Sequence, residues 1–197
     1  LLRPAGPGTV GAMHQLVQRC LRYRLVSGTA GGMAVAQGVR RLLCDRFRFD
    51  YNRPVEWGGL REIVPAVRAW CAMTALTVSD RPSPPVSATL ADADLLSGLA
   101  EMVFRADGDA VEALPMFEAV HKFRLTMQGP EHPSVATSYN NLGNVYNSQG
   151  DYPKAIGSDD SSLEIERKDS GPEHPYVATS YNNHGRVHDS QGGSPNA

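Results

Sequence analysis

The sequence predicts an all-α protein built from stacked helical hairpins, and two observations lead to this prediction. The pentapeptide Gly-Pro-Glu-His-Pro occurs at residues 129–133 and again at 171–175, which gives a period of 42 residues. The residues that follow also repeat, so that 17 of the 22 positions of 129–150 are identical in 171–192. A period between about 20 and 50 residues is typical of arrays of small units that bury their apolar faces against their neighbours. Such an array predicts a scaffold that binds other molecules and argues against a single catalytic pocket.

The segment after the first turn is predicted to form two helices. Within Val135–Ser148 the apolar and aromatic residues recur at spacings of mostly three and four, as on one face of a helix. Gly150 is placed to end this helix, and Asp151 to cap a second one that runs from about Tyr152 to Lys168. The turn at residues 171–175 ends the second helix and opens the next one with a proline. The unit is therefore helix, short turn, helix, longer turn.

This unit resembles the tetratricopeptide repeat. The first helix carries Tyr139-x-x-Leu142-Gly143-x-x-Tyr146 and the second carries Ala155, in the spacing of that signature. The Gly-Pro-Glu-His-Pro turn and the 42-residue period are similar to the longer repeats of kinesin light chains and nephrocystin-like proteins. The resemblance implies hairpins stacked as a short right-handed solenoid.

The repeats are predicted to occupy residues 89–197. Residues 129–170 form a clear repeat, and residues 171–197 form a truncated one that holds only its first helix. Subtracting 42 places a divergent repeat at 89–128, with a first helix from about Leu90 to Ala106. We expect the chain to be a fragment of a longer array or a decaying gene product.

Some positions depart from the repeat pattern. Asp159 stands where the divergent repeat has Phe117, and a buried carboxylate there would cost roughly several kcal/mol unless the helix end frays into water. His184 and His188 replace the Leu and the Tyr of the preceding repeat. These changes indicate that the array weakens towards residue 197.

Residues 1–88 differ from the repeats in charge. They contain twelve Arg, no Lys and five acidic residues, about +7, whereas residues 89–197 contain seven basic and sixteen acidic residues, about −9; the sum is the net charge of −2. We predict a region that is helical or partly disordered, with helices at Met13–Val26, Met33–Phe47 and Leu60–Val78. The Pro-rich segment 81–85 is a predicted linker at the domain boundary.

The Arg-rich start allows three interpretations. It can be a helical extension, the interpretation that we favour, an organellar transit peptide that begins near Met13, or a nucleic-acid-binding patch. No motif supports the last, so we expect no nucleic-acid partner. Three cysteines, an odd number without metal-type spacing, fit a reducing compartment. We therefore expect a cytoplasmic protein, or an organellar one if the start is a transit peptide, and no membrane span.

The sequence gives little sign of a catalytic or metal site. His184 and His188 have the i, i+4 spacing that can hold a metal, but no Glu follows the first and no third ligand is evident. No nucleophile elbow and no phosphate-binding glycine loop can be recognised. We expect no catalytic residue, no metal and no cofactor.

The resemblance implies a concave groove lined by the first helix of each repeat. The positions two residues before and after the signature Leu point into that groove, and they hold Asn140 and Asn144 in the second repeat and Asn182 and Arg186 in the third. Amides can pair with an extended peptide backbone, and Arg can hold a carboxylate in a bidentate fork. The implied ligand is a protein or peptide segment, and an acidic one fits Arg186.

Two functions remain open at this point. The first is a non-catalytic interaction scaffold that binds a partner's peptide segment in the groove. The alternative is an accessory repeat region of a larger enzyme or signalling ATPase, whose catalytic domain lies outside this sequence.

Overall fold

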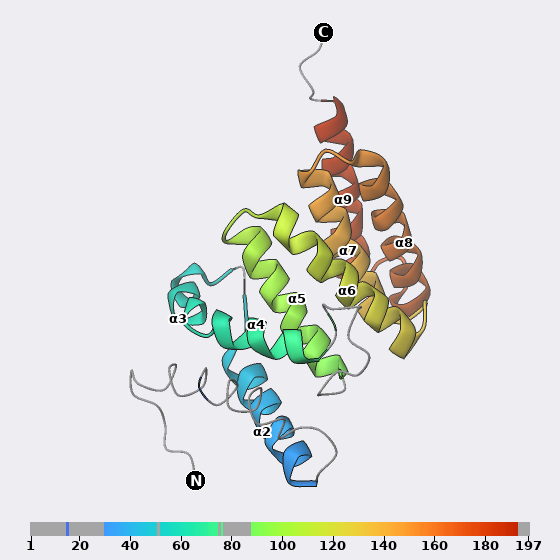
Figure 1. The fold of residues 1–197 in the computed structure, drawn as a ribbon. Coiled ribbons are helices and arrows are strands. Elements are labelled where there is room, and N and C mark those ends of the chain that lie inside the picture. Colours follow the sequence, from blue (N-terminus) through green and yellow to red (C-terminus); the bar gives the residue numbers. More distant parts are fainter. Residues whose placement is uncertain (1–14, 16–29, 51, 75, 77–87, 193–197) are drawn as a thin grey trace. The chain divides into compact units, whose positions relative to one another are not determined.

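The computed structural model describes residue 15 and residues 30–50, 52–74, 76 and 88–192. The regular structure of these residues is entirely helical, as the sequence predicted (Figure 1). The chain divides into two compact units, Leu1–Ala106 and Asp107–Ala197, which we describe one at a time. The sequence predicted a domain boundary near residue 88 from the start of the repeats, whereas the two units are defined by contacts between residues. The predicted boundary therefore stays a prediction. The predicted helix at Met13–Val26 and the linker at 81–85 lie outside the described residues.

The described ranges of the first unit include three longer helices and two short ones. They are α2 (Ala30–Arg46), the 3-10 helix η1 (Pro54–Glu56), α3 (Trp57–Arg61), α4 (Val64–Met73) and α5 (Leu90–Arg105). The prediction for α2 is confirmed to within a few residues. The single helix predicted at Leu60–Val78 is wrong, because the chain turns at residues 62–63 and starts again at α4. Pro65 lies in the first turn of α4, where its missing N–H costs no hydrogen bond.

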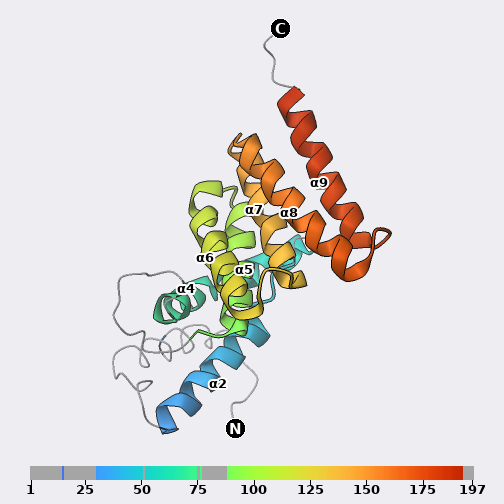
Figure 2. The ribbon, with the colours of Figure 1, turned by 90° about the vertical axis from the view of Figure 1, so that its right-hand side faces the viewer.

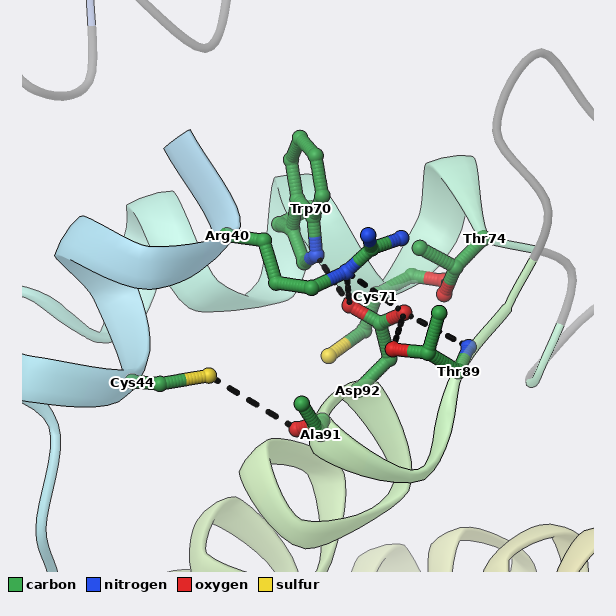
Figure 3. A network of polar contacts seen from close by, with 8 residues as sticks. All are labelled: Arg40, Cys44, Trp70, Cys71, Thr74, Thr89, Ala91 and Asp92. Carbon is green, nitrogen blue, oxygen red and sulfur yellow. Dashed lines mark hydrogen bonds and ion pairs between the residues drawn. The ribbon is translucent and has the colours of Figure 1, made fainter. Parts of the chain in front are cut away.

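A buried carboxylate joins three helices of the first unit (Figure 3). Asp92 on α5 is completely buried. Its Oδ1 accepts from Trp70 Nε1 on α4 at 2.7 Å and from Arg40 Nε on α2 at 2.9 Å. Its Oδ2 accepts from the Thr89 backbone N–H and hydroxyl, both at 2.8 Å, which closes the capping box of α5. A buried charge is tolerated when it is paired and hydrogen-bonded, so this network ties α2 and α4 to the start of α5.

The two cysteines near this network are structural thiols. Cys44 Sγ lies 3.7 Å from the Ala91 carbonyl oxygen, to which it donates a weak hydrogen bond. Cys71 is buried, and loss of solvation together with the charge of Asp92 raises the pKa of its thiol to about 12. A thiol that stays protonated is a poor nucleophile and a poor metal ligand, so Cys71 acts as a small core residue.

The second unit is a run of four helices in the described chain. They are α6 (Ala110–Gln128), α7 (Pro133–Ser148), α8 (Tyr152–Ser170) and α9 (Pro175–Gly192). Each packs against the next, and α9 also contacts α7 (Figure 2). The helices predicted at Val135–Ser148 and Tyr152–Lys168 correspond to α7 and α8. The prediction at Leu90–Ala106 corresponds to α5 in the first unit.

The turns of the second unit repeat with the sequence. Four of the described glycines adopt the left-handed backbone region, in two pairs 42 residues apart, with φ of 74° at Gly108, 76° at Gly150 and 84° at both Gly129 and Gly171. Side chains with a Cβ are strained in this region, which is why glycine marks these turns. Asp109 and Asp151 then cap α6 and α8, accepting from backbone N–H groups at 2.8 and 3.4 Å. The predicted helix end at Gly150 and cap at Asp151 are confirmed.

Candidate functional site

The four residues predicted to line a groove lie on two helices of the second unit. Asn140 and Asn144 are half-buried on α7, whereas Asn182 and Arg186 are exposed on α9. On each helix the two residues are four apart and therefore share a face. The structure thus places the same pair of positions in two different environments.

Asn140 is engaged inside the protein. Its Nδ2 donates to Glu166 Oε1 on α8 at 3.0 Å. The Ser180 hydroxyl on α9 lies 2.7 Å from Glu166 Oε2 and 3.1 Å from Asn140 Oδ1. The Ser162 hydroxyl lies 3.2 Å from Glu166 Oε1 and 2.9 Å from the carbonyl oxygen of Ala136. We call these four polar residues (Asn140, Ser162, Glu166 and Ser180) the polar spine, because they join α7, α8 and α9.

The sequence analysis missed the polar spine. Glu166 is only 8% exposed and accepts from three donors, which keeps an otherwise costly charge in the interface. One signal was present, since Ser138 recurs as Ser180 between the inward apolar residues of its helix. Ser138 is buried as well, and its hydroxyl contacts His121 Nδ1 of α6 at 2.9 Å. A serine at this repeat position therefore joins its helix to the preceding one in both copies.

The other three predicted residues keep polar atoms available. Asn144 Nδ2 donates to the Asn140 carbonyl oxygen at 2.8 Å, which leaves its Oδ1 without a partner among the described residues. The side chains of Asn182 and Arg186 make no hydrogen bond to any described residue, and both are exposed. An amide and a guanidinium one turn apart on a solvent-facing helix can together contact a peptide carbonyl and a carboxylate.

Asp159 is the most unusual group of the second unit. It stands on α8 in the repeat position of Phe117, it is 1% exposed, and neither carboxylate oxygen has a hydrogen-bond partner among the described residues. Burial raises its pKa to about 6, with a further contribution from Asp160, and Arg186 acts in the opposite direction. The helix does not fray here, because α8 continues to Ser170. The sequence analysis expected either a buried carboxylate at residue 159 or a frayed helix end. The structure shows the buried carboxylate.

The two histidines of α9 form a pair without forming a metal site. Their ring centroids lie 4.7 Å apart in a T-shaped contact, and His184 Nε2 lies 3.5 Å from Asp160 Oδ1. In the described part of the chain no group of three or more His, Cys, Asp or Glu residues could hold a metal ion. None of the described helices combines the length and apolarity needed to cross a membrane.

A tetratricopeptide-repeat family model matches residues 92–165 and 135–197, which together cover more than half of the chain. No curated protein sequence matches the chain. Among solved structures, the crystal structure of BtubC (BKLC) from P. vanneervenii is similar, with a TM-score of 0.60 and 18% identity over 92% of this chain. The chain spans 65% of that protein.

A putative kinesin light chain from Podosopora anserina, described as nearly identical TPR-like repeats, is also similar. One crystal structure of these repeats gives a TM-score of 0.54 at 20% identity, with 98% of this chain and 91% of that chain covered. A second crystal structure of them gives 0.53 at 20% identity, with 97% and 90% covered. At these identities the likeness shows the fold, which is that of kinesin light chain-like helical repeats.

Proposed function

Because the chain belongs to the tetratricopeptide-repeat family, we propose that it is a non-catalytic scaffold that binds a peptide segment of a partner protein. The observation that carries the proposal is the exposure of the polar side chains of Asn182 and Arg186. Both are exposed on α9, one turn apart, with side chains that no described residue engages by hydrogen bonding. Repeats of this family serve as protein-interaction scaffolds, and polar groups left free on a first helix are suited to a peptide ligand.

The charge of Arg186 favours an acidic segment. A guanidinium can hold a carboxylate through two parallel hydrogen bonds, and such charge-assisted bonds are stronger than neutral ones. Asn182 can donate to a peptide carbonyl and accept from a peptide N–H at the same time. Asn144 on α7 can add an acceptor through Oδ1. Asn140 has a different role in this proposal, because its amide holds Glu166 and Ser180 and so fixes α9 beside α7.

Affinity capture of partners from a lysate can test this proposal. We expect Asn182→Ala and Arg186→Ala each to reduce recovery of the specific partner several-fold. Arg167→Ala is the matched control, because Arg167 is also an exposed arginine of the second unit but lies on α8. Recovery that is equal for wild type, both α9 variants and the control would contradict the proposal.

A further inference from the structure

Several residues that depart from the repeat pattern meet where α8 contacts α9. Asp159 stands where the divergent repeat has a Phe, and His184 and Arg186 stand where the clear repeat has a Leu and an Asn. His184 Nε2 lies 3.5 Å from Oδ1 of Asp160, the residue next to Asp159, and the charge of Arg186 acts on the Asp159 carboxyl. We call Asp159, Asp160, His184 and Arg186 the α8–α9 joint.

Asp159 is the buried half of the joint. Its two carboxylate oxygens have no hydrogen-bond partner among the described residues, and its Oδ1 lies against Gly143 of α7. The titratable side chains of α7 are two tyrosines, which stay neutral near pH 6. The charges that act on Asp159 are therefore those of Asp160 on its own helix and Arg186 on α9. In these surroundings the neutral acid is favoured over the buried carboxylate.

His184 is the more exposed half of the joint. Its side chain is 30% exposed, and its Nε2 is within ion-pair distance of Asp160, whose side chain is 63% exposed. Histidine is the side chain that commonly changes its charge between pH 5 and 8. A protonated imidazole makes a charge-assisted contact with a carboxylate, which the neutral ring cannot make. The neighbouring ionisable groups on α9 are His188, whose ring packs on that of His184, and Asp189.

A fall in pH acts on both halves in the same direction. It removes the charge of Asp159, and with that charge the cost of its burial and its repulsion from Asp160. It also gives His184 the positive charge that pairs with Asp160. Arg186 opposes the first effect because it attracts ionised Asp159, but it is exposed and its charge is screened by water.

We propose that the α8–α9 joint is an acid-sensitive attachment, which holds α9 more firmly when Asp159 and His184 carry protons and less firmly when both have lost them. A buried carboxyl without hydrogen-bond partners and an imidazole beside a second carboxylate occupy the same contact between two helices. The Ser180 hydroxyl on α9 keeps its contact with Glu166 in either state, so the loss of protons loosens α9 without releasing it. The attachment needs no ligand, and it is therefore independent of the peptide site proposed above.

Hydrogen exchange of the 197-residue chain at pH 5 and pH 7.5 measures the attachment directly, once the rates are corrected for intrinsic exchange. We expect the protection of the α9 amides to fall about five- to tenfold from pH 5 to pH 7.5, because the pKa of Asp159 in the folded chain is about 6. Helix α4 is the internal reference, because it belongs to the first unit and holds no residue of the joint. Its protection should be the same at both pH values.

Two variants separate the halves of the joint. Asp159→Asn keeps the shape of the carboxyl group without its charge, so it should remove most of the pH dependence and raise the protection of α9 at pH 7.5. His184→Gln should lower this protection about threefold at pH 5, where the ion pair with Asp160 is lost, and leave it unchanged at pH 7.5. The double variant should show no pH dependence.

His188→Gln is the matched control. His188 is an exposed histidine of the same helix, and no acidic group of the described residues lies within ion-pair distance of its ring. The protection of α9 should therefore be the same as in wild type at both pH values. Circular dichroism checks that each variant keeps its helix content, and Asp159→Ala is a second neutral variant at the buried position.

Three results would overturn the proposal. The first is equal protection of α9 at pH 5 and pH 7.5 in the wild-type chain, a result that depends on no variant. The second is a pH dependence that remains in the double variant. The third is a loss of protection in His184→Gln that is equal at both pH values, since the imidazole would then act only by packing.

Discussion

Helices α7 and α9 have nearly the same sequence and different surroundings. Val, Ser and Val at matching positions point inward on both, yet Ala136 and Gly143 lie under α8 while Ala178 and Gly185 are exposed. The same amino acid therefore has two roles in one chain. Asn140 is part of the polar spine, whereas Asn182 is exposed on α9. The comparison teaches that a repeat fixes which way a residue points, and that the neighbouring helix decides what the residue does.

The largest effect is expected at Asp159, the buried residue of α8 whose carboxylate lies against Gly143 of α7. Asp159→Asn should stabilise the chain by up to about 3 kcal/mol near pH 8, because about 1.36 kcal/mol corresponds to each pKa unit and the pKa rises from 3.8 to about 6. Urea unfolding followed by circular dichroism measures the change. Asp160→Asn, next to it but largely exposed, should alter stability by less than about 1 kcal/mol. A destabilised Asp159→Asn variant would contradict this account of the α7–α8 contact.

The same carboxyl predicts a dependence of stability on pH. Asp159 keeps its proton up to about pH 6 in the folded chain and loses it near 3.8 in the unfolded chain, so the unfolded state binds fewer protons between these values. The contribution of protonated Asp159 to the free energy of unfolding is fully present below pH 3.8, and it is lost as the pH rises through about 6. The advantage of Asp159→Asn over wild type should therefore shrink by about 1 kcal/mol between about pH 7.5 and about pH 5. An advantage that stays constant over this range would show that Asp159 titrates normally.

Asn140 and Asn182 occupy matching repeat positions, but their replacement by alanine should change the stability of the chain to different extents. Asn140→Ala should destabilise the chain by about 1–2 kcal/mol, because it leaves Glu166 with one donor fewer in a buried interface. Asn182→Ala should change stability by less than about 0.5 kcal/mol, because its side chain is exposed. Denaturant unfolding of the two variants under one set of conditions gives both values. Equal losses would remove the distinction between a structural and a free asparagine.

Much of the second unit could be predicted from the sequence because its signals are local. The spacing of apolar residues, the glycines of the turns and the capping Asp151 lie within a few residues of what they determine. Pro65 gave a similar local signal in the first unit, and it should have divided the helix predicted at Leu60–Val78. Asp159 was recognised as a departure because Phe117 occupies the same repeat position.

The remaining features depend on contacts between distant residues. Asp92 meets Trp70 and Arg40, which are 22 and 52 residues away, and no local pattern indicates either pairing. The different environments of Asn140 and Asn182 could not be predicted, because the surrounding sequence is nearly the same in both copies. The difference arises because α8 contacts both helices but covers Asn140 through Glu166 and leaves Asn182 exposed.

The central claim, that α8 covers α7 while the matching face of α9 is open, is tested most directly by one substitution made in both copies. Gly143→Ala should destabilise the chain by about 1–2 kcal/mol, because the new Cβ collides with Asp159 and outweighs the better helix propensity of alanine. Gly185→Ala should stabilise it by about 0.5–1 kcal/mol, because only the propensity gain remains. Thermal and urea unfolding of the two variants should thus give changes of opposite sign. Changes of the same sign and size would contradict the claim.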